Sequence, residues 1–166
     1  MSNVPYPVGV GSFVPGSTPA EFVTLSGTNF KAPGWSFDAS ADESIESEAL
    51  FIPNYGSGNV TVHVDGISRS GSTSGNVVMG AAFSVRTPGD AQSVLTDAFA
   101  TENTVTQAIN STASGPTRCS ITVSNLDSLA ANDELVLRIR RLGSNGSDTM
   151  SGDFHVRAVT LVYSDT

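Results

Sequence analysis

Several residue types are scarce in this chain of 166 residues, and each scarcity excludes a class of protein. The single cysteine, Cys119, has no partner within the chain, which excludes a domain built on intrachain disulfides. Charged residues make up 14% of the chain, which excludes a coiled coil or a charged disordered tail. No apolar run approaches the roughly 18 residues that a membrane-spanning helix needs. A compact domain with an apolar core remains.

Positive charge is also scarce. Eight Lys and Arg residues stand against 16 Asp and Glu residues, and the formal net charge is −8. Such a chain repels phosphate backbones and anionic lipid headgroups, so we expect neither a nucleic acid nor a membrane as partner. The first residues lack the basic start and the continuous apolar run of a signal peptide, so we expect synthesis in the cytoplasm.

Proline is distributed unevenly. Five of the eight prolines lie in the first 33 residues and alternate with glycine, which predicts an extended segment rather than a helix. Residues 22–27, FVTLSG, are the one short strand expected there. We therefore divide the chain into an extended N-terminal arm, residues 1–33, and a β domain, residues 34–166.

The arm carries too much apolar surface for a solvated linker, so it is expected to lie against another surface. Two alternatives remain open: the arm packs on its own domain, or it binds a neighbouring subunit or a larger scaffold. On the second alternative, the partner-binding residues are Tyr6, Pro7, Val8, Phe13, Val14 and Phe22.

From Trp35 onward, apolar and polar residues alternate in short runs separated by Gly, Ser, Asn and Asp. This period of two is typical of strands with one buried face, and NVTVHVDG and ELVLRIRRL are clear examples. Counting all such runs predicts about eight strands. The fold class is therefore all-β, an antiparallel jelly-roll-like β-sandwich with an extended N-terminal arm. The one helix candidate is residues 90–103, with Asp90 as its N-cap.

A search for catalytic residues favours a protein that is not an enzyme. His63 and His155 both lie inside alternating strands, where they are expected on an outer sheet face, and no GxSxG motif occurs. The acidic run DASADESIESE supplies neither a cleft nor two distinct environments for a carboxylate pair. We expect no catalytic residues, no metal and no cofactor.

Two groups of residues are candidates for binding. Tyr55, in a turn, is the best candidate for an exposed ring that stacks on a glycan, whereas Trp35 is expected to plug one end of the core. The second group carries opposite charges in separate strands and has two possible roles, internal pairing or contact between identical subunits. Its members are Arg138, Arg140, Arg157, Glu46 and Glu48.

The order of these segments resembles a known family. FDASADESIESEALFIP, then NVTVHVDG, GNVVMGAAFSVR, ANDELVLRIRRLGS and GDFHVRAVTLVY are similar to the small jelly-roll virion proteins of tailed bacteriophages. These are capsid decoration (cement) proteins and head or tail fibre modules. The resemblance covers roughly residues 34–163 and implies a trimer whose terminal arm fastens it to the shell.

The resemblance implies a non-enzymatic virion protein, synthesised in the host cytoplasm. The leading interpretation is a capsid decoration protein, a homotrimer that binds the major capsid protein or another virion protein through its arm and stabilises the shell. The alternative is a receptor-binding or glycan-binding module of a phage fibre or tail. Its contacts would lie around Tyr55 and in the loops of residues 68–75 and 144–148.

Overall fold

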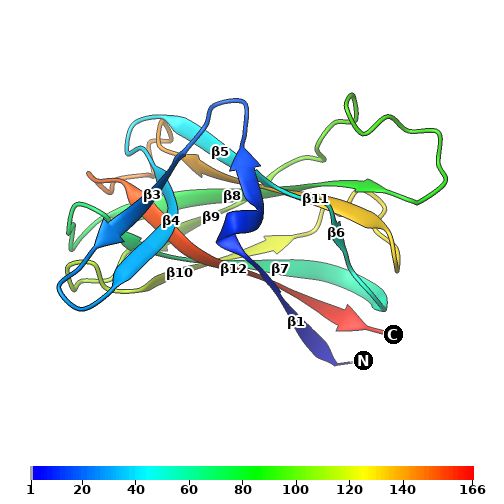
Figure 1. The fold of residues 1–166 in the computed structure, drawn as a ribbon, viewed down its shortest axis with the longest axis horizontal. Helices are drawn as coiled ribbons and strands as arrows, with labels where there is room; N and C mark the ends of the chain where they lie inside the picture. The colour runs from blue at the N-terminus through cyan, green and yellow to red at the C-terminus, as the bar shows by residue number, and fades with distance from the viewer. Residues whose placement is uncertain (1) are drawn as a thin grey trace.

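A computed structural model describes residues 2–166 and shows two antiparallel sheets packed face to face (Figure 1). The first sheet has the order β10 (Thr117–Val123), β7 (Tyr55–Ser68), β12 (Phe154–Asp165), β4 (Lys31–Phe37) and β3 (Glu21–Ser26), and β1 (Asn3–Val8) also pairs with β12. The second has the order β2 (Phe13–Pro15), β5 (Asp42–Ser47), β11 (Glu134–Leu142), β8 (Asn76–Arg86) and β9 (Asn103–Ala108), and β6 (Leu50–Phe51) also pairs with β11. The predicted all-β sandwich is confirmed.

The core lies between the two sheets and follows from the alternation in the sequence. In β7, Val60, Val62 and Val64 are fully buried while the residues between them are partly exposed. In β11, Leu135, Leu137 and Ile139 are the fully buried set. Inward side chains of both sheets thus form one apolar layer, the expected source of most of the folding free energy.

The predicted helix at residues 90–103 is wrong. This segment belongs to a loop that leaves β8, extends past the end of the sandwich and returns over the outer face of the second sheet (Figure 1). Its carboxylates bind arginines of that face: Asp97 lies 3.4 Å from Arg86 and Glu102 lies 2.9 Å from Arg140. These tertiary ion pairs outweigh the weak preference of so short a segment for a helix. In residues 2–166 the one helix is the 3₁₀ turn η1 (Val10–Ser12), and no helix there could cross a membrane.

Residues 3–8, 13–15 and 21–26 form strands of the sandwich. β1 pairs with β12, β2 with β5 and β3 with β4, and the boundary predicted after residue 33 falls inside β4. Val8 and Phe13 are each 4% exposed and pack in the chain's own core, so their assignment to a partner-binding arm is wrong. Their side chains face inward because their strands join the two sheets in register with core residues. For these residues the own-domain alternative holds.

The other residues assigned to the arm differ in exposure. Tyr6 is partly buried against the core, whereas Pro7 is exposed. Val14 and Phe22 remain about half exposed, and the Phe22 ring contacts Trp35 edge-on at a centroid distance of 5.2 Å. Trp35 itself is buried, as predicted, and its Nε1 donates to the carbonyl oxygen of Val10. The indole thus ties β4 to the segment between β1 and β2.

A buried ion pair joins the two sheets at one end of the sandwich. The Arg141 guanidinium donates to both carboxylate oxygens of Asp148, at 2.8 and 3.0 Å, and neither side chain is exposed. The remaining N–H groups of Arg141 donate to the carbonyl oxygens of Phe37, Met150 and Gly152. Because Phe37 ends β4 and residues 150–152 precede β12, Arg141 holds two strands of the opposite sheet in place.

We expect Phe13→Ala to lower the free energy of unfolding by about 3–5 kcal/mol, because it leaves a cavity in the core. The neighbouring variant Val14→Ala is the matched control, and its effect should stay within about 0.5 kcal/mol since Val14 is half exposed. Urea denaturation of the isolated chain measures both. Equal, small effects would contradict the burial of the N-terminal segment in its own domain.

We expect Arg141→Met to lower the free energy of unfolding by about 3–5 kcal/mol, because it leaves the Asp148 carboxylate buried without its cation. Arg118→Met removes another bidentate pair, with Asp65, but that pair is exposed and should contribute at most about 1 kcal/mol. Chemical denaturation of both variants at one pH tests this difference. Similar losses in the two variants would refute a special role for the buried pair.

Candidate functional site

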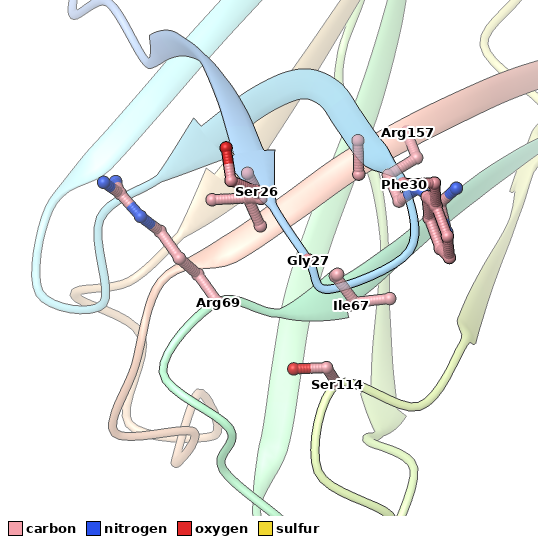
Figure 2. A pocket seen from close by; sticks show the side chains of 9 residues that line it. Ser26, Gly27, Phe30, Ile67, Arg69, Ser114 and Arg157 are labelled. Carbon is pink, nitrogen blue, oxygen red and sulfur yellow. The ribbon is translucent and has the colours of Figure 1, made fainter.

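A pocket of about 370 Å³ lies between the tip of the β3–β4 hairpin and the outer face of the first sheet (Figure 2). The hairpin supplies one wall, and β7, β12 and the loop between β9 and β10 supply the other. Its lining residues are Leu25, Ser26, Gly27, Phe30, Ala32, Ile67, Arg69, Ser114 and Arg157. A volume above about 300 Å³ is in the range of small-molecule sites.

Local sequence places Phe30 at the mouth of this pocket. The backbone N–H of Gly27 donates to the carbonyl oxygen of Phe30 at 3.0 Å and closes the hairpin turn. The turn leaves the Phe30 side chain 64% exposed, although a phenyl ring has no polar group that water would stabilise. Phe30 therefore offers an apolar ring surface to any ligand that enters this pocket.

The hairpin is fixed to the sheet beneath it by β12. A Cβ at Gly34 would overlap the carbonyl oxygen of Val156, so glycine allows β4 to approach β12 closely. Nε2 of His155 lies 3.1 Å from the carbonyl oxygen of Ala32, a second link between the strands. These contacts set the position of the hairpin tip, and hence of Phe30, relative to β7 and β12.

Two arginines supply the charged groups of the pocket. The Arg157 guanidinium carbon lies 5.8 Å from the centroid of the Phe30 ring, a cation–π distance. Arg69 is held by Glu21 at 3.4 Å and by Asp153 at 3.3 Å, and its side chain remains 37% exposed. Figure 2 shows the Phe30 and Arg157 side chains together at one side of the pocket and Arg69 at the opposite side.

The outer face of the first sheet continues from this pocket as a polar surface. A second hollow of about 240 Å³ shares Arg157 and is also lined by Asp65, Pro116 and Ala158. Asp65 accepts two hydrogen bonds from Arg118, at 2.7 and 2.8 Å. The two hollows therefore adjoin at Arg157, and β7, β12 and the loop before β10 contribute lining residues to both.

The two histidines of this face differ in environment. His63 is partly exposed and its Nδ1 lies 2.9 Å from Oγ of Ser120. His155 is fully buried, so the expectation that both histidines face solvent or a neighbouring chain is wrong for it. The β3–β4 hairpin covers it. Burial, with the nearby charges of Arg157 and Arg69, lowers the pKa of His155 below its ordinary 6.5, and the hydrogen bond to Ala32 opposes this only in part.

The pair His63 and Ser120 does not extend to a triad. Neither histidine is hydrogen-bonded to a carboxylate within residues 2–166, and the nearby carboxylate of Asp65 binds Arg118. The imidazole therefore lacks the third group that orients the base in a Ser-His-Asp site. A hydrolytic role for this pair has no geometric support.

The residue predicted to bind a glycan is in the core. Tyr55 is 6% exposed, its hydroxyl donates to the carbonyl oxygen of Gly58, and its ring packs near that of Tyr163. The prediction of an exposed ring is wrong because residue 55 begins β7 with its side chain directed inward. Of the two loops predicted beside it, residues 144–148 contain the buried Asp148, whereas residues 68–75 contribute Arg69 to the pocket.

The charged residues predicted to contact another subunit are divided between the sheets: Arg157 lies in the first, whereas Arg138, Arg140 and Glu46 lie in the second. The loop after β8 covers two of them: the Arg138 guanidinium lies 4.4 Å above the Phe99 ring and Arg140 pairs with Glu102. Glu46 is the cross-strand neighbour of Arg138 and is partly exposed, whereas Glu48 is exposed. Arg140 thus pairs within the chain, with a different carboxylate from those predicted. Subunit contact through Glu46, Glu48 or Arg157 stays a prediction.

Sequence reasoning missed Phe30 and Ser114, and it included Arg69 only as part of the loop of residues 68–75. A signal for Phe30 was present, because GTNFK places a large apolar residue at a turn between polar residues, where no core can cover it. Arg69 and Ser114 carry no comparable signal. They reach the pocket only because residues 69 and 114 lie in loops at the same end of the sheet.

No family model matches the chain, and no curated protein matches it. Solved structures of similar fold include a family 35 carbohydrate-binding module from Clostridium thermocellum, with a TM-score of 0.52, 12% identity and coverage of 95% of this chain and 97% of that one. The CBM22-1 xylan-binding domain of Paenibacillus barcinonensis Xyn10C has a TM-score of 0.52, 8% identity and coverage of 98% and 94%.

A third similar structure is the family 11 carbohydrate-binding module from Clostridium thermocellum in complex with a β-1,3-1,4-mixed-linked tetrasaccharide. Its TM-score is 0.51, its identity 12%, and the coverage is 95% of this chain and 94% of that one. At these identities the likeness concerns the fold. The chain has a jelly-roll β-sandwich of the kind found in carbohydrate-binding modules.

We expect the stability of the chain to fall as the pH drops below 6.5, because the unfolded chain binds a proton at His155 that the folded chain disfavours. His155→Gln removes this pH-dependent contribution to stability. The difference in the free energy of unfolding between wild type and variant should therefore shrink as the pH falls from 7. Urea denaturation across this pH range measures it, with His63→Gln as the control that keeps the buried histidine. A pH-independent difference would contradict the prediction.

Proposed function

We propose that this chain is a non-catalytic saccharide-binding module whose site is the pocket beside Phe30. The observation that carries the proposal is the exposed Phe30 ring, which stands next to Arg157 at the mouth of a pocket on the outer sheet face. Apolar surface and hydrogen-bond donors thus meet within one site.

The chemistry of a sugar ring fits this combination. A pyranose has faces of C–H groups and a rim of hydroxyl groups, so it binds where an apolar ring and polar side chains converge. In this pocket Phe30 offers the apolar face. Arg69, Arg157, Ser26 and Ser114 place donors and acceptors around it.

The length of the site favours an oligosaccharide over a single sugar. The two hollows meet at Arg157, and beyond them the outer face carries the pairs Asp65–Arg118 and His63–Ser120. A chain of linked sugars that stacks on Phe30 can extend over these polar groups. Each further ring would add hydrogen bonds at the surface.

The similar solved structures add support by analogy of fold. One is described as xylan-binding and another holds a bound tetrasaccharide, so this sandwich is suited to presenting saccharide sites. Fold analogy does not define a ligand. The choice of saccharide therefore has to come from the pocket itself.

The phage assignments stay predictions. Location in a virion, a homotrimer and the major capsid protein as partner have no support in the pocket or in the comparisons. The decoration mechanism also loses part of its basis, because Val8 and Phe13 are buried in the chain's own core. A glycan-binding module of a phage fibre or tail is the form of the virion hypothesis that the proposed site suits.

We expect the chain to bind at least one saccharide saturably on a glycan array, and Phe30→Ala to weaken that binding about tenfold by removing the stacking surface. Isothermal titration calorimetry with the array hit measures the affinity of wild type and variant.

Phe51→Ala is the matched control. Phe51 is also a half-exposed phenylalanine, 53% exposed, but it lies in β6 outside the pocket, so this variant should bind like wild type. Absence of saturable binding on the array would refute the proposed function. Equal losses of affinity in Phe30→Ala and Phe51→Ala would show that the saccharide does not bind at Phe30.

A further inference from the structure

The charge of the pocket is opposite to that of the chain. Its only charged lining residues, among those described, are Arg69 and Arg157, and no carboxylate lines it, although the net charge is −8. Three other hollows are each lined by at least one carboxylate, for example Glu134 in one and Asp127 in another. Glu21 and Asp153 pair with Arg69, so Arg157 is the unpaired positive charge of the pocket beside Phe30.

Arg157 differs from most other arginines in lacking an acidic partner. Across residues 2–166, no carboxylate lies within 4.0 Å of its guanidinium. Ion pairs engage Arg69, Arg86, Arg118, Arg140 and Arg141. The Arg157 side chain is exposed and close to the Phe30 ring. A planar guanidinium with free N–H donors is the group that binds a carboxylate in bidentate geometry.

Lys31 adds to the positive charge at the hairpin tip. It follows Phe30 directly and pairs across the hairpin with Ser26, which lines the pocket. Within the described chain it too has no carboxylate within 4.0 Å, since none of the ion pairs includes it. Arg157 and Lys31 are thus unpaired cations near one end of the first sheet, and of these two Arg157 lines the pocket.

From these observations we infer that the saccharide is acidic and that a carboxylate on one of its sugar rings binds Arg157. This inference rests on the proposed function and specifies its ligand class. The ring of the acidic sugar stacks on Phe30 while its carboxylate accepts hydrogen bonds from the Arg157 guanidinium. The acidic surface of the chain repels such a ligand at long range, so the selectivity comes from these short-range contacts.

Two pairs of saccharides that differ in a carboxylate test the inference by isothermal titration calorimetry on the full chain. The pairs are tetragalacturonate with its methyl ester and sialyllactose with lactose. We expect the acidic member of at least one pair to bind about tenfold more tightly than its neutral counterpart. We also expect its affinity to fall as the NaCl concentration rises, because salt screens the contact with Arg157.

Arg157→Gln should reduce the affinity for the acidic saccharide to that for its neutral counterpart. Arg138→Gln is the matched control: it removes an arginine that also lies over a phenylalanine ring, but on the second sheet and outside the pocket, so the preference should persist. Thermal unfolding of each variant verifies its fold. A preference that survives Arg157→Gln would overturn the inference.

The remaining outcomes separate the inference from the proposed function. If acidic and neutral members bind equally and Phe30→Ala weakens both, the inference is overturned and the proposed function stands. If the chain binds a neutral saccharide on the array but neither tetragalacturonate nor sialyllactose, the inference is likewise overturned and the proposed function stands. If no saccharide of any charge binds, both are overturned.

Discussion

The architecture depends on one buried ion pair between two elements of the sandwich. Arg141, at the end of β11, binds Asp148 of the following loop and three backbone carbonyls next to β4 and β12. A buried guanidinium is stable only when its donors are satisfied, so the pair requires these segments to meet at one place. β4 carries the hairpin and β12 carries Arg157. The ion pair thus fixes the end of β4 and the start of β12, the two strands that contribute Ala32 and Arg157 to the candidate site.

The two outer sheet faces are covered by different means. On the second sheet, the loop after β8 lies over three arginines, pairs Arg86 and Arg140 with its carboxylates and places the Phe99 ring against Arg138. On the first sheet, the β3–β4 hairpin covers His155 but leaves a pocket at its tip. On the proposed function this difference matters, because Arg157 on the first sheet stays accessible to a ligand while these arginines of the second sheet are engaged internally.

Much of the β domain was predictable because side chains alternate across a strand. The runs around Val62 and Leu137 predicted inward faces that the structure confirms. Residues near turns were harder to predict. Tyr55 and Phe30 both lie close to glycine-containing turns, yet Tyr55 is buried in the core and Phe30 is exposed, because the direction of a side chain there depends on the turn geometry and on what packs above it.

By itself the sequence determined the fold class, most of the strands from residue 35 onward and the absence of a helix-based or disulfide-based architecture, since periodicity and composition act locally along the chain. Only the tertiary structure decided where the N-terminal segment packs and which side chains form the pocket. The physical reason is separation along the chain. The pocket residues are far apart in sequence, and strand pairing and the buried Arg141 bring them together; they are Phe30, Arg69, Ser114 and Arg157. No local pattern encodes that proximity.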